Sequence, residues 1–340
     1  MKIQDIRHVG LLSPAIASHA RFYIEAWELL SVGEGRSTGE GRHAQYFHGA
    51  SADHHILSLH ASERRGLHHL AFSVDGCDAV DAAATELEGR GITFVAHPGD
   101  LDKPGGGYGL RFLDPENRCI ELSAAVTRHA NGGSDERDGP GERDGSDECD
   151  GPGGRDGSDE RVAPDESDGL RRLCHVGLNT ARFDQIVAFY TDVLGFRVSD
   201  WIEDRMVFLR SGRRHHAIVF TRADHASVNH VAYGMSGVDA VMRRISNLRA
   251  LGREPDWGPG RHGPGNNIFC YYTDPAGYVI ECSSDLVYIE DEVTHEPAVW
   301  RRGPETLDYW GTAGAPDPDV RKAMAGDPDP GWTAQGLVED

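Results

Sequence analysis

The chain has 340 residues, which is long enough for two domains that each bury a core of their own. Its formal net charge of -21 argues against a nucleic-acid partner, because phosphate binding depends on clustered lysine and arginine side chains. The first residues, MKIQDIRHVGLL, do not form a signal peptide, no apolar run is long enough to cross a membrane, and the six cysteines contain no CxxC pair. We therefore expect a cytoplasmic protein without nucleic-acid or membrane partners.

The first half of the chain contains two short apolar segments that are typical of strands. They read RHVGLL at 7–12 and HHLAFSV at 68–74. A helix is predicted after each strand, and two or three further strands then complete each unit, the last of them within DPENRCIEL at 114–122. Each unit is therefore predicted to have the order βαβββ.

A linker is predicted at 127–169. From 133 onward the sequence repeats the pattern GSDERDGPGERD, which is acidic and has no aliphatic side chain. Such a segment cannot bury enough apolar surface to offset the entropy of ordering it, so we expect it to be disordered. Its spacing matches neither an EF-hand loop nor a nonapeptide β-roll, and we interpret it as a domain boundary.

The second half repeats the same order of elements. Strands are predicted in CHVGLN at 174–179 and NHVAYG at 229–234. The helix after the first of them has one apolar face and ends at Gly195, and the helix after the second ends at Gly252. Closing strands are predicted in MVFLRSG, HHAIVFT, NNIFCYYTDP and YVIECSS.

The two halves also match in detail, which indicates an internal duplication. The interval from His8 to Tyr23 equals that from His175 to Tyr190, and DPENRCIEL corresponds to DPAGYVIEC at 274–282. The sequence predicts an α+β fold of four βαβββ modules paired into two domains. The expected boundaries are 1–126 for the first domain, 127–169 for the linker, 170–290 for the second domain, and 291–340 for a partly disordered extension.

Three candidate metal ligands occupy corresponding strand positions in the second half. His175 and His230 lie on the first strands of the third and fourth modules, and Glu281 lies on the last strand of the fourth. Pairing of these strands would bring the three side chains together. Two neutral imidazoles and one carboxylate can hold a divalent metal on one face and leave other positions open, which suits non-haem Fe(II) and oxygen.

The sequence resembles the vicinal-oxygen-chelate superfamily and, within it, the two-domain type I extradiol ring-cleaving dioxygenases. The resemblance covers about 5–124 and 172–290. It assigns the metal to His175, His230 and Glu281, and it places an active-site histidine at His216 in RRHHAIVF. A further histidine corresponds to His262 in GRHGPG, and the family's tyrosine corresponds to Tyr271 in IFCYYTDP.

The resemblance implies an enzyme that opens the ring of a substituted catechol beside the diol and adds both atoms of O2. The implied product is of the hydroxymuconic-semialdehyde type, formed in aromatic catabolism with Fe(II), or Mn(II), as cofactor. His216 is suited to accept a hydroxyl proton and to donate one later, while His262 and Tyr271 would hydrogen-bond the oxygens of the substrate or intermediate. We also expect a homo-oligomer.

Other histidines and one tyrosine are weaker candidates. His215 is expected on the opposite strand face, directed to solvent, and His225 in a loop, while Tyr272 is the alternative to Tyr271. The first half carries its own set, with His8, His69 and Glu121 at the ligand positions and His55 before His69. Arg111 corresponds there to Tyr271, and Asp102 to His262. We expect this copy to be an ancestral site without catalysis, so that each chain binds about one metal.

Two alternative functions stay open. The same fold supports metal-dependent isomerases or lyases of the glyoxalase kind, in which the metal acts as a Lewis acid on an enediolate. It also supports ligand-sequestering proteins of the bleomycin-resistance kind, which need a groove but no metal. Oxygen chemistry is favoured by the combination of His216, His262 and Tyr271, and the complete triad argues against simple sequestration.

Overall fold

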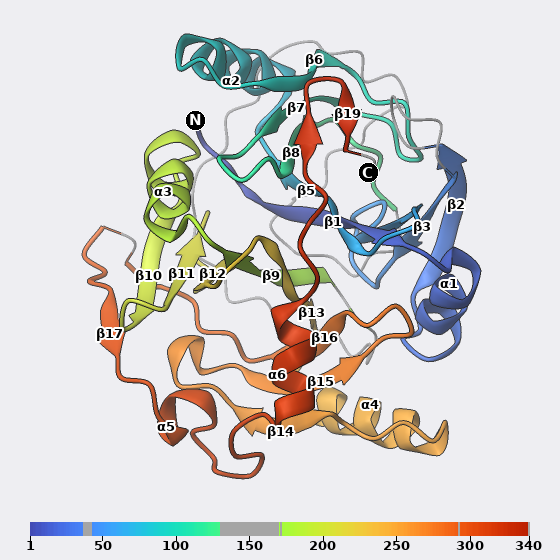
Figure 1. Cartoon of the computed structure of the whole chain (residues 1–340), viewed down its shortest axis with the longest axis vertical. Coiled ribbons are helices and arrows are strands. Elements are labelled where there is room, and N and C mark those ends of the chain that lie inside the picture. The colour runs from blue at the N-terminus through green and yellow to red at the C-terminus, as the bar shows by residue number, and fades with distance from the viewer. Residues whose placement is uncertain (37–42, 130–169, 171, 292, 339–340) are drawn as a thin grey trace.

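The fold is described from a computed structural model, which covers residues 1–36, 43–129, 170, 172–291 and 293–338 (Figure 1). Each half of the chain forms one large sheet with helices against it. The predicted α+β class with four βαβββ modules is confirmed. Nearly all of the predicted linker, 127–169, lies outside the described residues, and no helix within them is long and apolar enough to span a membrane.

The N-terminal sheet has eight strands in the order β2-β3-β4-β1-β5-β8-β7-β6. The first strands of its two modules, β1 and β5, pair antiparallel at the centre. The first module comprises β1 Asp5–Ser13, α1 Ile16–Glu25, β2 Leu30–Arg36, β3 His43–His48 and β4 Leu57–Ala61. The second comprises β5 Gly66–Ser73, α2 Cys77–Gly89, β6 Phe94–Asp100, β7 Tyr108–Leu113 and β8 Cys119–Ala124.

The C-terminal sheet has nine strands in the order β14-β15-β16-β13-β9-β12-β11-β10-β17, with β9 and β13 antiparallel at its centre. The third module comprises β9 Arg172–Thr180, α3 Phe183–Ala188, β10 Arg197–Ile202, β11 Met206–Arg210 and β12 Ile218–Arg222. The fourth comprises β13 Ser227–Gly234, α4 Val238–Ala250, β14 Trp257–Arg261, β15 Ile268–Thr273 and β16 Val279–Ser284.

Both predicted helix ends in this half lie where glycine is needed. Gly195 and Gly252 have φ values of 76° and 74°, which side chains other than glycine adopt with strain. The first of these helices differs from a plain α-helix, because α3 continues as one π-helical turn at Phe189–Val193. The apolar spacing of this segment does not distinguish a π turn from an α turn over so short a length.

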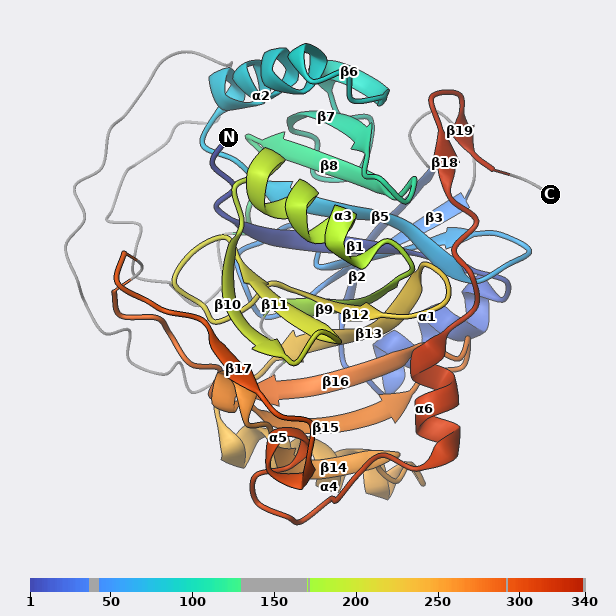
Figure 2. The same cartoon turned by 60° about the vertical axis from the view of Figure 1, so that its left-hand side comes forward.

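The segment after β16 contacts both halves of the molecule. It contains β17 Ala298–Trp300, α5 Pro304–Leu307, α6 Pro318–Ala325, β18 Trp332–Thr333 and β19 Gly336–Leu337. β17 pairs parallel with β10 at the edge of the C-terminal sheet. Figure 2 shows the chain then passing through α6 to β18 and β19 beside the N-terminal sheet, where Trp332 packs against Leu113 and Cys119. The predicted extension thus contains ordered elements over its described residues.

The two halves meet through a reciprocal pair of contacts. Tyr23 of α1 donates to Asp274 in the turn between β15 and β16, with an O–O distance of 3.1 Å. Tyr190 of the third module donates to Asp114 in the corresponding turn of the N-terminal half, at 3.5 Å. A single hydrophobic cluster includes buried residues from both halves. The positions that matched between the two halves of the sequence are therefore the ones that join them.

Candidate metal centre

Three side chains converge on one face of the C-terminal sheet. Ala232 of β13 pairs with His175 of β9 on one side and with Glu281 of β16 on the other, and His230 lies two residues before it. The Nε2 atoms of His175 and His230 are 3.1 Å apart, and Oε2 of Glu281 lies 3.3 Å and 3.5 Å from them. All three side chains are buried. The structure thus brings the three predicted ligands together around Ala232, whose small side chain leaves room between them.

A glycine lets one of these imidazoles lie flat against the neighbouring strand. Gly177 of β9 pairs with His230, and a Cβ atom at this position would come within 2.4 Å of the His230 ring. Gly10 has the same relation to His69 in the N-terminal half, at 2.3 Å. The single glycine of CHVGLN, Gly177, is therefore a functional signal in the sequence that the ligand spacing alone does not reveal.

The donor set fits a divalent cation. Burial lowers the pKa of His175 and of His230 to about 3, so both rings are neutral near pH 7 and offer lone pairs. Burial also raises the pKa of Glu281, and its Oε2 atom has no hydrogen-bond partner among the described residues. A metal ion would satisfy this oxygen and supply the positive charge that the pocket of neutral rings lacks.

A chain of amides holds His230 in place. Nδ1 of His230 lies 2.8 Å from Oδ1 of Asn229, so the ring donates there and keeps Nε2 for a metal. Asn229 in turn donates to Oδ1 of Asn179 at 3.0 Å, and Asn179 donates to the carbonyl oxygens of Met324 and Ala325 in α6. The sequence gives no signal for this role of Asn229, because an amide beside a ligand has no distinctive spacing.

Replacing Asn229 by leucine is expected to weaken metal binding without removing a ligand. The His230 ring would lose the acceptor that fixes its orientation, and loss of such a partner typically costs about 10-fold to 100-fold in affinity. Competition titration with a metal-binding dye would measure the change. Asn229→Asp, which keeps an oxygen acceptor, is the matched variant and should bind metal more tightly than the leucine variant; equal affinities of the two would contradict this role.

His216 lies beside the three ligands. Its ring centroid is 4.3 Å from that of His175, and burial lowers its pKa well below the usual value for histidine. Nδ1 of His216 lies 2.9 Å from Nδ1 of His215. The expectation that His215 faces solvent is wrong: the side chain is buried, and its Nε2 atom lies 3.1 Å from Oδ2 of Asp200. The residues before β12 do not alternate as a regular strand would.

His262 and Tyr271 form a second polar pair near the ligands. Nε2 of His262 lies 3.0 Å from the Tyr271 hydroxyl, and Nδ1 lies 2.8 Å from the carbonyl oxygen of Leu307. Since a carbonyl only accepts, His262 donates from Nδ1 and Tyr271 donates to Nε2. The Tyr271 ring stands edge-on to His230, whereas Tyr272 points to the other sheet face and packs against Trp27. His225 contacts the carbonyl of Gly326, in the loop after α6.

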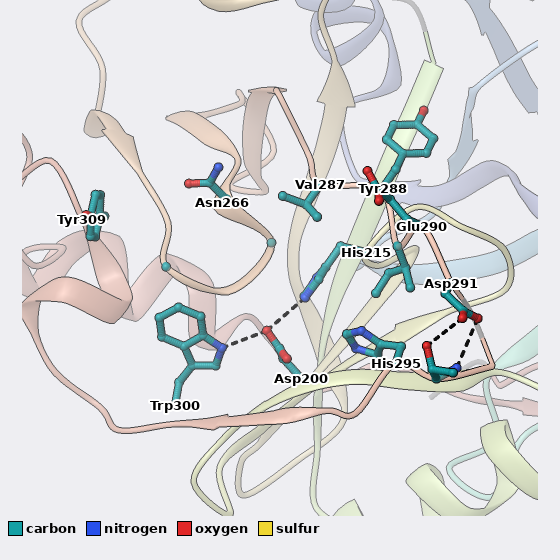
Figure 3. A pocket seen from close by; sticks show the side chains of 14 residues that line it. Asp200, His215, Asn266, Val287, Tyr288, Glu290, Asp291, His295, Trp300 and Tyr309 are labelled. Carbon is teal, nitrogen blue, oxygen red and sulfur yellow. Dashed lines mark hydrogen bonds and ion pairs between the residues drawn. The ribbon is translucent and has the colours of Figure 1, made fainter. Parts of the chain in front are cut away.

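A pocket of about 610 Å³ lies next to this group (Figure 3). None of the three predicted ligands lines it; it reaches the site through His215 and through Gly265 of the His262 loop. Its described lining contains three carboxylates, Asp200, Glu290 and Asp291, and no lysine or arginine. The rest of the lining includes Tyr288, His295, Trp300 and Tyr309.

The N-terminal copy is arranged differently around its carboxylate. His8 and His69 lie 2.8 Å apart between their Nε2 atoms, as in the C-terminal site, and His55 lies beside His8. Glu121, however, accepts from Arg111 at 2.9 Å and from the ammonium of Lys103, and both cations are buried. Burial lowers the pKa of Lys103 to about 8, although the neighbouring carboxylate opposes this. Two side-chain cations thus neutralise the carboxylate that a metal would need.

The register of the sheets changes one correspondence between the halves. Arg261 pairs with Ile268 in the C-terminal sheet, and Asp100 pairs with Tyr108 at the equivalent place in the N-terminal sheet. The residue that corresponds to His262 is therefore Leu101, where the sequence analysis placed Asp102. The error arose because the loop after β6 is one residue longer than the loop after β14.

Replacing each of the two carboxylates by glutamine is expected to change the stability of the fold differently. Glu121→Gln leaves two buried cations without a counter-charge and should lower the free energy of unfolding by about 3–5 kcal/mol. Glu281→Gln in the metal-free protein removes a carboxylate that burial already disfavours, and should not destabilise the fold. Urea unfolding of both metal-free variants and the parent tests this; a loss for Glu281→Gln as large as that for Glu121→Gln would refute it.

Comparisons with known proteins agree with this architecture. The pattern of the Glyoxalase/Bleomycin resistance protein/Dioxygenase superfamily matches residues 5–122 and 172–282. Metapyrocatechase 2 of Cupriavidus necator is 28% identical over 74% of this chain and 77% of that protein. The structure of a Mn(II)-bound glyoxalase from Novosphingobium aromaticivorans is 32% identical, with a TM-score of 0.77 and 94% of both chains covered.

A further solved structure shares the fold. Homoprotocatechuate 2,3-dioxygenase from Brevibacterium fuscum has a TM-score of 0.76, 20% identity, and coverage of 100% of this chain and 96% of that one. The predicted resemblance to the two-domain type I extradiol dioxygenases is confirmed by these relatives. The chain belongs to the Glyoxalase/Bleomycin resistance protein/Dioxygenase superfamily.

Proposed function

We propose that the chain is an Fe(II)-dependent extradiol dioxygenase that cleaves the ring of a substituted catechol. The observation that carries this proposal is the convergence of His175, His230 and Glu281 with His216 directly beside them. Fe(II) held by these ligands would lower the pKa of the catechol hydroxyls and would supply the redox chemistry that activates O2. Similarity to metapyrocatechase 2 supports the reaction class.

The side chains near the ligands would transfer protons and bind the substrate oxygens. Burial lowers the pKa of His216, so the ring is neutral and has a nitrogen lone pair that can accept a proton from one catechol hydroxyl. The proton that His216 has gained can later be returned to an oxygen of the opening ring. The Tyr271 ring stands edge-on to His230, and His262 orients the Tyr271 hydroxyl by accepting its proton. The hydroxyl oxygen can at the same time accept from a substrate hydroxyl, and it can donate to a substrate oxygen if it releases His262. Both atoms of O2 end in a hydroxymuconic-semialdehyde-type product.

One alternative has a specific observation in its favour. The relative at 32% identity is described as a Mn(II)-bound glyoxalase, which is consistent with an isomerase or lyase that uses the metal as a Lewis acid. Manganese is also a second candidate for the dioxygenase itself. Oxygen chemistry is favoured here by the additional His262–Tyr271 pair. A homo-oligomeric state stays a prediction.

The test is anaerobic reconstitution with Fe(II), and in parallel with Mn(II), followed by air and a panel of catechols. We expect oxygen uptake and a yellow ring-fission product. Iron that is demonstrably bound while no catechol is consumed would refute the proposal and favour the isomerase, which a hemithioacetal substrate would then reveal.

The panel should also show a preference in charge. The pocket beside His215 carries carboxylates and no basic side chain among its described lining residues, so a substituent that enters it should be uncharged. We expect kcat/KM for 3-methylcatechol or 4-methylcatechol to exceed that for the corresponding dihydroxybenzoates or dihydroxyphenylacetates. Burying an unpaired carboxylate beside like charges is costly, so a preference of 10-fold or more, about 1.4 kcal/mol, is expected. Preference for the anionic catechols would rule this pocket out as the substituent site.

A further inference from the structure

A buried carboxylate is connected to His216 through its neighbour in the sequence. Oδ2 of Asp200, on β10, lies 3.1 Å from Nε2 of His215, and Nδ1 of His215 lies 2.9 Å from Nδ1 of His216. Figure 3 shows Asp200 between His215 and Trp300, with a hydrogen bond to each. The three groups form a continuous line that begins at the pocket and ends at the predicted acid–base residue.

The carboxylate is held in place from the C-terminal segment. Trp300 of β17 donates its indole N–H to Oδ2 of Asp200 at 2.8 Å, and the backbone N–H of Ala298 donates to Oδ1 at 2.9 Å. Burial alone would raise the pKa of Asp200, but the hydrogen bonds from His215 and Trp300 outweigh it and the pKa is lowered. Asp200 is therefore an ionised acceptor, and it cannot donate to His215.

This acceptor determines where the protons of both rings lie. Because Asp200 only accepts, Nε2 of His215 must carry a proton. When this is the only proton on the ring, Nδ1 of His215 is an acceptor. Nδ1 of His216 must donate to it, which leaves Nε2 of His216 without a proton. We infer that Asp200 and His215 are positioning residues that fix the tautomer of His216, so that its Nε2 atom is free to accept the substrate proton.

The inference rests on the proposed function for its catalytic meaning, but the tautomer itself can be observed without any substrate. The full-length, metal-free protein labelled with ¹⁵N-histidine would be examined by two-bond ¹H–¹⁵N correlation spectra. These distinguish a protonated ring nitrogen from one with a lone pair. The His216 signals would be assigned by their loss in His216→Gln. In the parent protein we expect Nδ1 of His216 to be protonated and Nε2 to be unprotonated.

Asp200→Leu tests the cause. Leucine removes the acceptor that faces Nε2 of His215, so the His215 ring is no longer held in one tautomer and His216 should become a mixture of its two tautomers. Trp300→Phe is the matched control, because it removes one donor to Asp200 and leaves the acceptor intact. It should keep the parent tautomer. Should Asp200→Leu fail to fold, His215→Phe removes the same connection while preserving a ring of similar bulk, and should leave His216 as a mixture of tautomers.

The result that overturns the inference is an unchanged His216 tautomer in a folded Asp200→Leu or His215→Phe variant, or a parent protein with Nε2 protonated. Kinetics give a second, separate measurement on the iron-loaded enzyme. We expect Asp200→Leu to lower kcat by about 10-fold to 100-fold, less than removal of the imidazole, with KM little changed. A parent enzyme that turns over no catechol would refute the proposed function. The tautomer assignment would then be decided by the spectra alone.

Discussion

His175→Ala is expected to abolish both metal binding and ring cleavage, whereas His8→Ala should leave most of both. The two histidines occupy equivalent positions on β9 and β1, and each faces a second histidine at about 3 Å. Only His175 faces a carboxylate oxygen that has no hydrogen-bond partner among the described residues. Loss of a direct ligand should exceed the roughly 10-fold to 100-fold cost of losing an outer hydrogen bond.

Metal analysis after reconstitution, together with oxygen uptake, measures this pair of variants. The parent and His8→Ala should each contain about one metal per chain, and His175→Ala close to none. Two metals in the parent would mean that Lys103 and Arg111 do not replace the ion in the N-terminal half. Retained activity in His175→Ala with loss in His8→Ala would place catalysis in the other half of the molecule.

His216→Gln is expected to slow catalysis while metal is retained. The side chain contacts the His175 ring but contributes no atom to the set of three ligands, so its loss removes proton transfer and leaves coordination intact. Positioned general acid–base groups contribute about 10²-fold to 10⁴-fold, and kcat should fall within that range. Stopped-flow absorbance of the ring-fission product would measure the change.

The control is His55→Gln, which changes the corresponding histidine beside His8. It should leave kcat nearly unchanged, because that ring lies in the half whose carboxylate is already paired. If His216→Gln loses its metal, the residue holds the ligands in place and is no proton carrier. If the two variants are equally active, another group performs the proton transfer.

The ligand set was predictable from the sequence because duplication made it visible. His175, His230 and Glu281 each have a counterpart in the first half, and pairing of their three strands brings these positions together. The sequence also separated the two copies, because Arg111 stands where Tyr271 does, but it did not predict how Glu121 is neutralised. That pairing depends in part on Lys103, which comes from the loop after β6, and loop residues have no register that a sequence pattern could reveal.

The surroundings of the ligands were predicted less well, for two physical reasons. His215 and His216 lie just before β12, where strand alternation does not hold, so the faces of adjacent side chains could not be assigned. Asp200 and Trp300 are far apart in sequence and meet only because β17 pairs with β10. Contacts of this kind depend on tertiary packing, and the local composition around Ala298 gives no periodic signal.

The reciprocal contacts of Tyr23 with Asp274 and Tyr190 with Asp114 have the form of an isologous interface, in which one residue pair occurs twice about a two-fold axis. Here the axis relates two parts of one chain and no longer relates two molecules. Joining them makes their association independent of protein concentration and frees each copy to change alone. The N-terminal copy could then exchange a metal ion for the ammonium of Lys103, a substitution that a symmetric dimer would have to make in both of its active sites at once.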